Sequence, residues 1–245
     1  MVNRCFTIKI KNNMVSSNFR VLLLGLLAFC MFSCNKSAVK PVVKNNPSTL
    51  TYENELFSID YPKGWVCDSS GWKGLDSLQN VVDIYDPNGG IVWFHFVKSF
   101  LPMRFENIGE AKEMAKAARA YSGDNAELIY EEDNAEIGGY PASVLCFANF
   151  VDNDTIIQKQ FVTYLPDSHI LVYFNENFYA QNIDEAQKIG DRIIATIKLK
   201  QVKNPLDNDS VFRKIVKGLD ENSVQKKYLD RAKLIIEQYE RKHHP

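Results

Sequence analysis

The chain has 245 residues, of which 45% are hydrophobic, 12% aromatic and 24% charged, so it is long and apolar enough to bury a core. Its formal net charge is −1, and the part that follows residue 33 carries 25 basic against 30 acidic residues, a net charge of −5. This acidic balance argues against a nucleic-acid-binding protein, because the phosphate backbone favours basic surfaces.

The first element is an apolar run from Val21 to Ser33. It holds 13 residues without a charge, too few for a spanning helix, which needs roughly 20. Four basic residues and no acidic residue precede the run, and a small residue ends it. This layout is typical of a secretory signal, with the start at Met1 or at Met14; the competing interpretation is a buried helix with a core cysteine.

The end of this run, Met31-Phe32-Ser33-Cys34, resembles the lipobox of bacterial lipoproteins. The resemblance implies that residues 1–33 are removed as a signal peptide and that lipid, such as palmitate, is attached to Cys34. Residues 34–50 are rich in Lys, Pro and Asn and read as a flexible tether. Asn35 stands where an aspartate would imply retention in the inner membrane, so we expect an outer-membrane anchor that faces the periplasm. The sequence leaves the leaflet undecided.

Residues 51–200 carry the first predicted strands and a helix. Residues 57–61 alternate apolar and polar side chains, and the turn that follows leads to a short strand at 65–67, so we expect a first hairpin. A polar stretch follows at 68–80, and then two strands between 81 and 99 joined by the turn 86–90. A helix is predicted within 105–123, where apolar residues recur at helical spacing: Ile108, Ala111, Met114, Ala115 and Ala118.

A strand meander and a second helix complete this part of the chain. Residues 126–176 read as three or four antiparallel strands, with turns at 138–139, 152–154 and 166–168. Residues 182–199 place Ala186, Ile189, Ile193 and Ile197 on one helix face. The predicted fold class is therefore α+β, a mainly antiparallel sheet with helices packed on it.

Two short motifs resemble those of the Mog1/PsbP-like group, which includes bacterial DUF1795-type and DcrB-type proteins. They are "LFSIDYPKGW", with Tyr61, Pro62, Gly64 and Trp65 in a turn, and "GGYPASVLCF", with Gly139, Tyr140 and Pro141 at the start of a strand. The resemblance covers about residues 51–200 and implies a Mog1/PsbP-like sandwich with an accessory or binding role. None of these residues is a catalytic signature.

Residues 201–245 form a predicted helical C-terminal extension beyond that resemblance. A short helix is expected to begin at Asp209 or Ser210, which would cap it. The final helix carries an apolar stripe of Val224, Tyr228, Ala232, Ile235 and Tyr239. These helices either pack back on the domain or dock a partner.

Cysteines and histidines are the main candidates for chemistry. Cys67 and Cys146 lie on apolar segments, so we expect buried thiols, with one disulfide as the alternative. His95 lies on a predicted strand on the same face as Trp93 and Val97, where a hydrogen-bonded structural histidine is expected. His169 follows Asp167 and Ser168, but adjacent residues do not provide triad geometry.

Other polar clusters have ordinary interpretations. His243 and His244 are expected to be solvated at the chain end, because a metal site needs three or four fixed ligands. Residues 152–154 lack the glycine and glutamate of a calcium loop and read as a turn. Residues 131–133, Glu-Glu-Asp, are expected to form a solvated strand end. No catalytic, cofactor-binding or metal-binding residues are assigned.

The predicted function is that of a non-catalytic, lipid-anchored periplasmic lipoprotein that engages an envelope protein, through its loops or an exposed aromatic residue such as Trp72. A carrier of a small apolar or lipid ligand is the alternative, suggested by the aromatic runs "IVWFHF" and "ILVYFNENFY". A hydrolytic enzyme is the third hypothesis. It would require a pocket that gathers His95 or His169 with two carboxylates.

Overall fold

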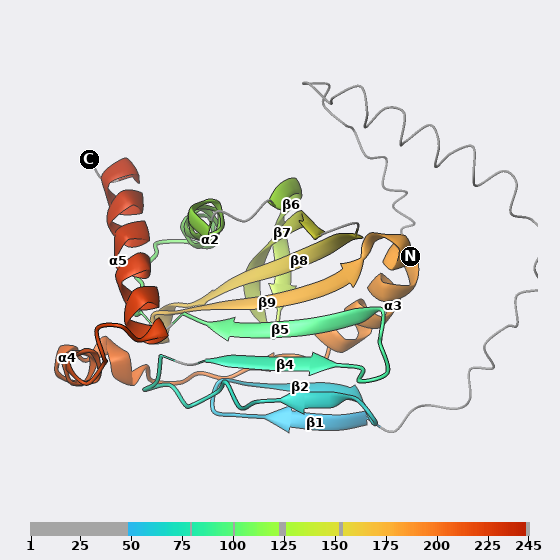
Figure 1. Ribbon diagram of the computed structural model, residues 1–245, viewed down its shortest axis with the longest axis horizontal. Coiled ribbons are helices and arrows are strands. Elements are labelled where there is room, and N and C mark those ends of the chain that lie inside the picture. The colour runs from blue at the N-terminus through green and yellow to red at the C-terminus, as the bar shows by residue number, and fades with distance from the viewer. Residues whose placement is uncertain (1–48, 79, 100, 123–125, 152–153, 244–245) are drawn as a thin grey trace, which may run out of the picture. The chain divides into compact units, whose positions relative to one another are not determined.

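The computed structural model describes residues 49–78, 80–99, 101–122, 126–151 and 154–243 (Figure 1). These residues belong to one compact unit. The predicted signal peptide, Cys34 and most of the predicted tether lie outside the described residues, as do Asp152, Asn153 and His244. None of the helices in the described ranges combines the length and apolarity needed to cross a membrane.

Two antiparallel sheets form the framework. The larger has seven strands in the order β3-β4-β5-β9-β8-β7-β6, and the smaller has three in the order β1-β2-β10. The large-sheet strands are β3 (Val66–Asp68), β4 (Val81–Tyr85), β5 (Val92–Lys98), β6 (Ala126–Ile137), β7 (Tyr140–Val151), β8 (Asp154–Leu165) and β9 (Ile170–Tyr179). The small sheet contains β1 (Thr49–Glu53), β2 (Phe57–Pro62) and β10 (Lys198–Leu199). The predicted α+β class with a mainly antiparallel sheet is confirmed, as are the four strands between 126 and 179.

The predicted hairpin between residues 57 and 67 is wrong. A turn follows β2, in which Gly64 has φ +98° and the Trp65 N–H donates to the Pro62 carbonyl at 3.1 Å. The chain then passes from the small sheet to the large one, where β3 pairs with β4 and not with β2. Local sequence predicts a turn here but not which strand the chain pairs with afterwards.

One face of the large sheet packs against the small sheet and helix α3 (Ile183–Ile194). This main core contains phenylalanines from four strands, and the Phe57 ring lies 5.5 Å from that of Phe96 and 5.7 Å from that of Phe174. The second predicted helix is confirmed but ends at Ile194. Ile197 is buried beyond its end, because the chain turns there to enter β10.

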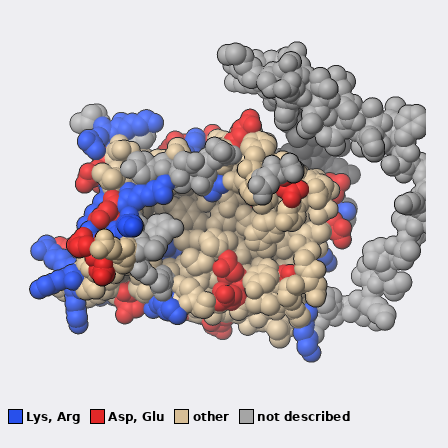
Figure 2. All heavy atoms as spheres, in the orientation of Figure 1, with Lys and Arg blue, Asp and Glu red and all other residues tan. Residues whose placement is uncertain are grey.

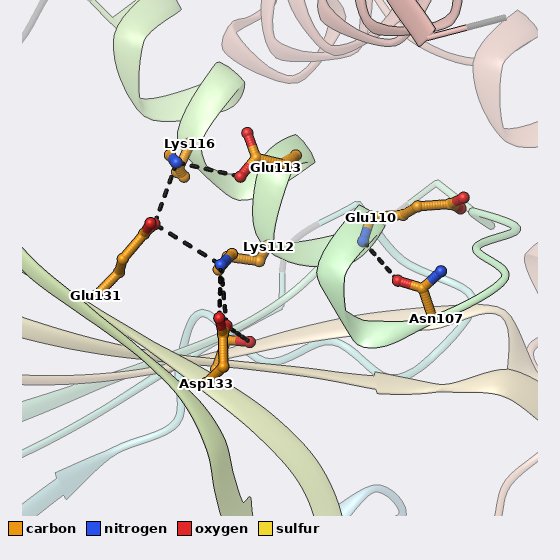
Figure 3. Close-up of polar contacts among 8 residues, drawn as sticks. Asn107, Glu110, Lys112, Glu113, Lys116, Glu131 and Asp133 are labelled. Carbon is orange, nitrogen blue, oxygen red and sulfur yellow. Dashed lines mark hydrogen bonds and ion pairs between the residues drawn. The ribbon is translucent and has the colours of Figure 1, made fainter.

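The opposite face packs against helices α2 (Ile108–Ser122) and α5 (Val224–His243). The first predicted helix is therefore confirmed. Glu131, Glu132 and Asp133 are exposed as predicted, but they lie within β6 and not at its end. Two of the three also pair with α2 (Figure 3). Lys112 Nζ lies 2.9 Å from Asp133 Oδ1, and Lys116 Nζ lies 3.1 Å from Glu131 Oε2. Because the Lys112 side chain is largely buried, its pair with Asp133 joins α2 to the edge of the sheet and lowers the Asp133 pKa.

The C-terminal extension consists of a 3-10 turn (Pro205–Asp207), helix α4 (Asp209–Lys217) and α5. The cap of α4 is Asn208, whose Oδ1 accepts from the Ser210 N–H at 3.0 Å, so the predicted cap at Asp209 or Ser210 is off by one or two positions. Helix α5 contributes Tyr239 to a second core, which lies between the large sheet and α2. Its Leu229 is also fully buried. The predicted apolar stripe also includes Val224 and Tyr228, whose side chains the structure does not describe.

Both described cysteines are free thiols. The cross-strand register places them in one row across the sheet, but β4, β5, β9 and β8 lie between β3 and β7. The Cα atoms of the two cysteines are therefore about 24 Å apart in the direction across the strands. The Cα atoms of a disulfide lie within about 7 Å of each other. Burial raises the pKa of Cys67 and of Cys146 to about 11, so both thiols stay protonated at neutral pH.

Candidate functional site

The part of the large sheet that α2 and α5 leave open presents two rows of polar and aromatic side chains, here called the polar sheet face. The first row pairs Asp83, His95, Asn175 and Gln160 across β4, β5, β9 and β8. The second row, two residues along each strand, pairs Tyr85, Trp93, Asn177 and Gln158. The same strands bury Ile84, Phe94, Phe96 and Phe174 in the main core, because successive side chains point to opposite faces.

His95 is hydrogen-bonded to a carboxylate. Its Nδ1 lies 2.6 Å from Asp83 Oδ1, and the two side chains are 41% and 43% exposed. Asp68 lies next to Asp83 in the register but accepts from the Ser70 N–H at 2.9 Å, which lowers its pKa. His95 therefore shares its face with Trp93 as predicted, and it is hydrogen-bonded as expected.

His169 occupies a turn at the other end of the sheet. Its φ is 52° and its Nδ1 lies 3.1 Å from Asp207 Oδ2, not against Asp167 or Ser168. Ser168 is buried and its hydroxyl donates to the Val202 carbonyl. Across the described ranges, no group of three or more His, Cys, Asp and Glu side chains is placed to hold a metal ion. Each of these two histidines thus has one carboxylate partner, and the adjacent serine and aspartate do not form a triad with His169.

The polar sheet face borders a hollow of about 620 Å³ near the turn between β4 and β5. Its lining includes the carboxylates of Asp68, Asp83 and Asp86 and the rings of Tyr85, Trp93 and Tyr179, with no lysine or arginine. Figure 2 shows a broad, nearly uncharged surface over the middle strands, with acidic side chains at the level of β4 and β5. This surface suits binding of an uncharged or cationic group and disfavours anions.

A second exposed feature is an apolar patch where the paired strands β6 and β7 end. It consists of Leu128, Ile129, Phe150 and Val151, whose exposed fractions are 39%, 41%, 51% and 49%. The register holds these strands together at this end, with Leu128 opposite Phe147 and Ala126 opposite Asn149. Leu128 and Val151 lie on one face of the sheet and Phe150 on the other, because successive side chains of a strand alternate. The four residues therefore leave the margin of the sheet apolar on both faces. Exposed apolar side chains at such a margin are typical of protein–protein contact sites.

Trp72 is less exposed than predicted. Its indole packs edge-on against Phe57 at 5.9 Å and its Nε1–H donates to Glu55 Oε1 at 3.0 Å. Its ring is partly buried against the main core, and its role in partner contact stays a prediction.

An apolar cavity of about 170 Å³ lies between the large sheet, α2 and α5. Its lining includes Met103, Met114, Tyr173 and Ile235. Ligand pockets usually measure about 300–1,000 Å³, and a cavity near 150 Å³ holds a molecule the size of benzene. This cavity is too small to enclose a lipid chain.

A buried ionic cluster lies under α3. Glu176 on β9 is fully buried, and its Oε2 lies 3.2 Å from Lys159 Nζ, which also lies 3.5 Å from Asp191 Oδ1. Burial raises the pKa of Glu176 to about 7, and the Lys159 ammonium only partly offsets this effect. The cluster joins the sheet to α3 through groups that carry a desolvation cost.

The raised pKa of Glu176 predicts a pH-dependent stability. Between its ordinary value of 4.5 and about 7, the unfolded chain releases this proton while the native state retains it. The free energy of unfolding therefore falls as pH rises through this window, by up to about 3 kcal/mol, and Glu176 adds no further change above it. Urea unfolding of wild type and Glu176→Gln at several pH values tests this. The variant should gain stability relative to wild type from pH 4.5 to 7, and parallel profiles would contradict the prediction.

The amide residues of the polar sheet face were not singled out from sequence. In "NENFY" and "IIQKQF" these amides alternate with residues of the opposite face, which include the apolar Ile157, Phe161 and Phe178 as well as Lys159 and Glu176. That alternation predicts which side chains share a face but not that β5 pairs with β9. The partners of His95 could therefore not be found from sequence alone.

No family model matches the chain, and a search of curated proteins returns no match. Several solved structures are similar in fold. Cyanobacterial PsbP (CyanoP) from Synechocystis sp. PCC 6803 is 20% identical, with a TM-score of 0.47 over 68% of this chain and 98% of that one. The Saccharomyces cerevisiae Ran-binding protein Mog1p is 9% identical, with a TM-score of 0.40 over 67% of this chain and 99% of that one.

LpqN, described as involved in cell envelope biogenesis of Mycobacterium tuberculosis, is 11% identical, with a TM-score of 0.40 over 63% of this chain and 90% of that one. At these identities the likeness concerns the fold alone. The predicted architecture, a mainly antiparallel sheet with helices packed on it, is confirmed by the strand order and the helix positions of this chain.

Proposed function

We propose that the protein is a lipid-anchored lipoprotein of the cell envelope, attached through Cys34 to the outer membrane on its periplasmic side. There it acts as a non-catalytic binding module for an envelope protein. The lipobox-like junction at Met31-Phe32-Ser33-Cys34 supports the anchor. The observation that carries the binding role is the apolar patch of Leu128, Ile129, Phe150 and Val151.

The surroundings of the patch favour a protein partner. Half of the large apolar residues that are exposed in the described ranges lie in this patch. Strand β6 is an edge of the large sheet and carries Glu127, Glu131, Glu132, Asp133 and Glu136. Residues 49–200 contain 12 basic against 23 acidic residues, a net charge of −11. An acidic rim around an apolar centre suits a protein surface and repels nucleic acid and anionic lipid.

Photo-crosslinking in intact cells tests the partner. A photoreactive amino acid replaces Phe150 or Ile129 in the patch, and Ile183, which is 42% exposed outside it, serves as the matched control. Both patch positions should yield the same discrete adduct with an envelope protein, and Ile183 should not. Patch positions without an adduct, or identical adducts from all three positions, would count against this partner site.

Metabolic labelling with a fatty-acid analogue tests the anchor. Cys34→Ala should abolish the label and release the protein from the membrane fraction, because the acyl chains supply the membrane affinity, about 0.8 kcal/mol per buried CH₂. Cys30→Ala is the control, since Cys30 lies in the same apolar run but precedes the junction. Persistent labelling of Cys34→Ala would refute lipidation at this residue.

A further inference from the structure

The floor of the polar sheet face is built from amides that the protein holds in place. Asn175 and Asn177 are only 4% and 6% exposed. The Asn175 Nδ2 donates to the His95 carbonyl at 3.1 Å, and Gln160 Nε2 donates to Asn175 Oδ1 at 3.0 Å. The Oε1 atoms of Gln158 and Gln160 are buried and have no hydrogen-bond partner among the described residues. The floor is thus uncharged and fixed in position, and contact with a ligand falls to the side chains that line the hollow.

Aromatic rings border this floor on one side. Trp93 and Tyr179 lie with ring centroids 5.5 Å apart and planes inclined by 57°. Tyr85 is opposite Trp93 in the register and is 39% exposed. Such rings offer apolar faces beside polar groups, so they can cover the C–H side of a ligand whose edges are polar.

The charges at the hollow restrict the ligand further. Asp68, Asp83 and Asp86 line it, and its lining includes no lysine or arginine. Phosphates, carboxylates and anionic lipid headgroups are therefore disfavoured. Carboxylates only accept hydrogen bonds. A ligand bound beside these carboxylates and rings must therefore carry hydrogen-bond donors without a negative charge, and it must also present an apolar face.

Hydroxyl groups on a ring with apolar faces meet all of these requirements. We propose that the hollow beside the polar sheet face binds a neutral saccharide, with Tyr85 and Trp93 stacking on a sugar ring and Asp83 and Asp86 accepting hydrogen bonds from its hydroxyls. The hollow of about 620 Å³ has the size of a small-molecule site. This site lies on a different surface from the apolar patch and does not rest on the proposed protein partner.

Isothermal titration of the full chain tests the saccharide site. The protein is purified in a detergent without a sugar headgroup and titrated with chitotetraose, maltotetraose and cellotetraose, and with tetragalacturonate as the anionic counterpart. At least one neutral tetrasaccharide should bind and tetragalacturonate should not. Tyr85→Ala and Asp83→Asn should each weaken binding about tenfold.

A matched variant separates the site from general effects on the fold. Phe150→Ala also removes an exposed aromatic side chain, but from the apolar patch, so it should leave saccharide affinity unchanged. Three results would overturn the assignment: no neutral tetrasaccharide binds at millimolar concentration, tetragalacturonate binds equally well, or Tyr85→Ala and Asp83→Asn bind like wild type. If a photoreactive amino acid at position 85 crosslinks to a protein, this face binds a polypeptide and the saccharide assignment is likewise overturned. If only the crosslinks at position 150 fail to form, the result counts against the proposed protein partner and not against the saccharide site.

Discussion

A chain truncated after Lys200 is expected to lose its cooperative fold. The deletion removes Leu206, Leu229 and Tyr239, which are 2%, 0% and 7% exposed, together with the partly buried Ile235 and Ile236. Each large buried side chain contributes about 1.5–3 kcal/mol, so the sum reaches the total stability of a typical domain, about 5–15 kcal/mol. Urea unfolding followed by fluorescence should show no cooperative transition for the truncated chain.

The truncation also exposes the surface that α5 covers. Met114 and Leu171 are buried in the same core, and the Tyr239 hydroxyl donates to the Glu110 carbonyl at 3.2 Å. A chain that ends at Lys242 is the control, because it keeps every α5 residue of that core and should unfold like wild type. If the chain ending at Lys200 unfolds cooperatively with wild-type stability, α5 is dispensable for the fold and would be free to dock a partner.

Gly190→Ala is expected to destabilise the protein by about 2 kcal/mol. An added Cβ at this position would lie 1.8 Å from Glu176 Oε1 and 2.4 Å from Glu176 Cδ. Glu176 is fully buried beside Lys159, so its carboxylate has little room to move. Overpacking of this kind costs about 1–3 kcal/mol or more, and it outweighs the gain of roughly 1 kcal/mol that alanine brings to a helix interior.

A double-mutant cycle isolates this contact. Gly190→Ala should be much less destabilising in a Glu176→Ala background, where the overlapping carboxylate is absent. Gly218→Ala is the control, since the nearest atom to its added Cβ lies 3.5 Å away. Equal effects of Gly190→Ala in both backgrounds, measured by urea unfolding, would place the cost elsewhere in α3.

Much of the architecture follows from local patterns. Period-two alternation predicted β4 and β5 and the four strands from β6 to β9, and helical spacing predicted α2, α3 and α5. Glycine and proline marked the turns, as at Gly64 and Gly139, which have φ +98° and +87°. These signals work because they depend on neighbours along the chain.

The pairing of distant segments was decided by the tertiary structure. β5 pairs with β9, so His95 meets Asn175 across 80 residues of sequence, and β2 pairs with β1 and β10 rather than with β3. Glu176 resembles any polar strand residue in the sequence, yet the strand order and Gly190 place it in the interior.

The sequence by itself therefore determined the apolar run from Val21 to Ser33, the acidic balance, the turns and the face that each side chain shares with its neighbours along a strand or helix. Only the tertiary structure decided which strands are adjacent, that Trp72 is packed, that Glu131 and Asp133 bind α2, and that α5 completes a core. The physical reason is that side-chain periodicity is a local property of the backbone. Strand adjacency and burial arise from long-range packing of the whole chain, which no single segment encodes.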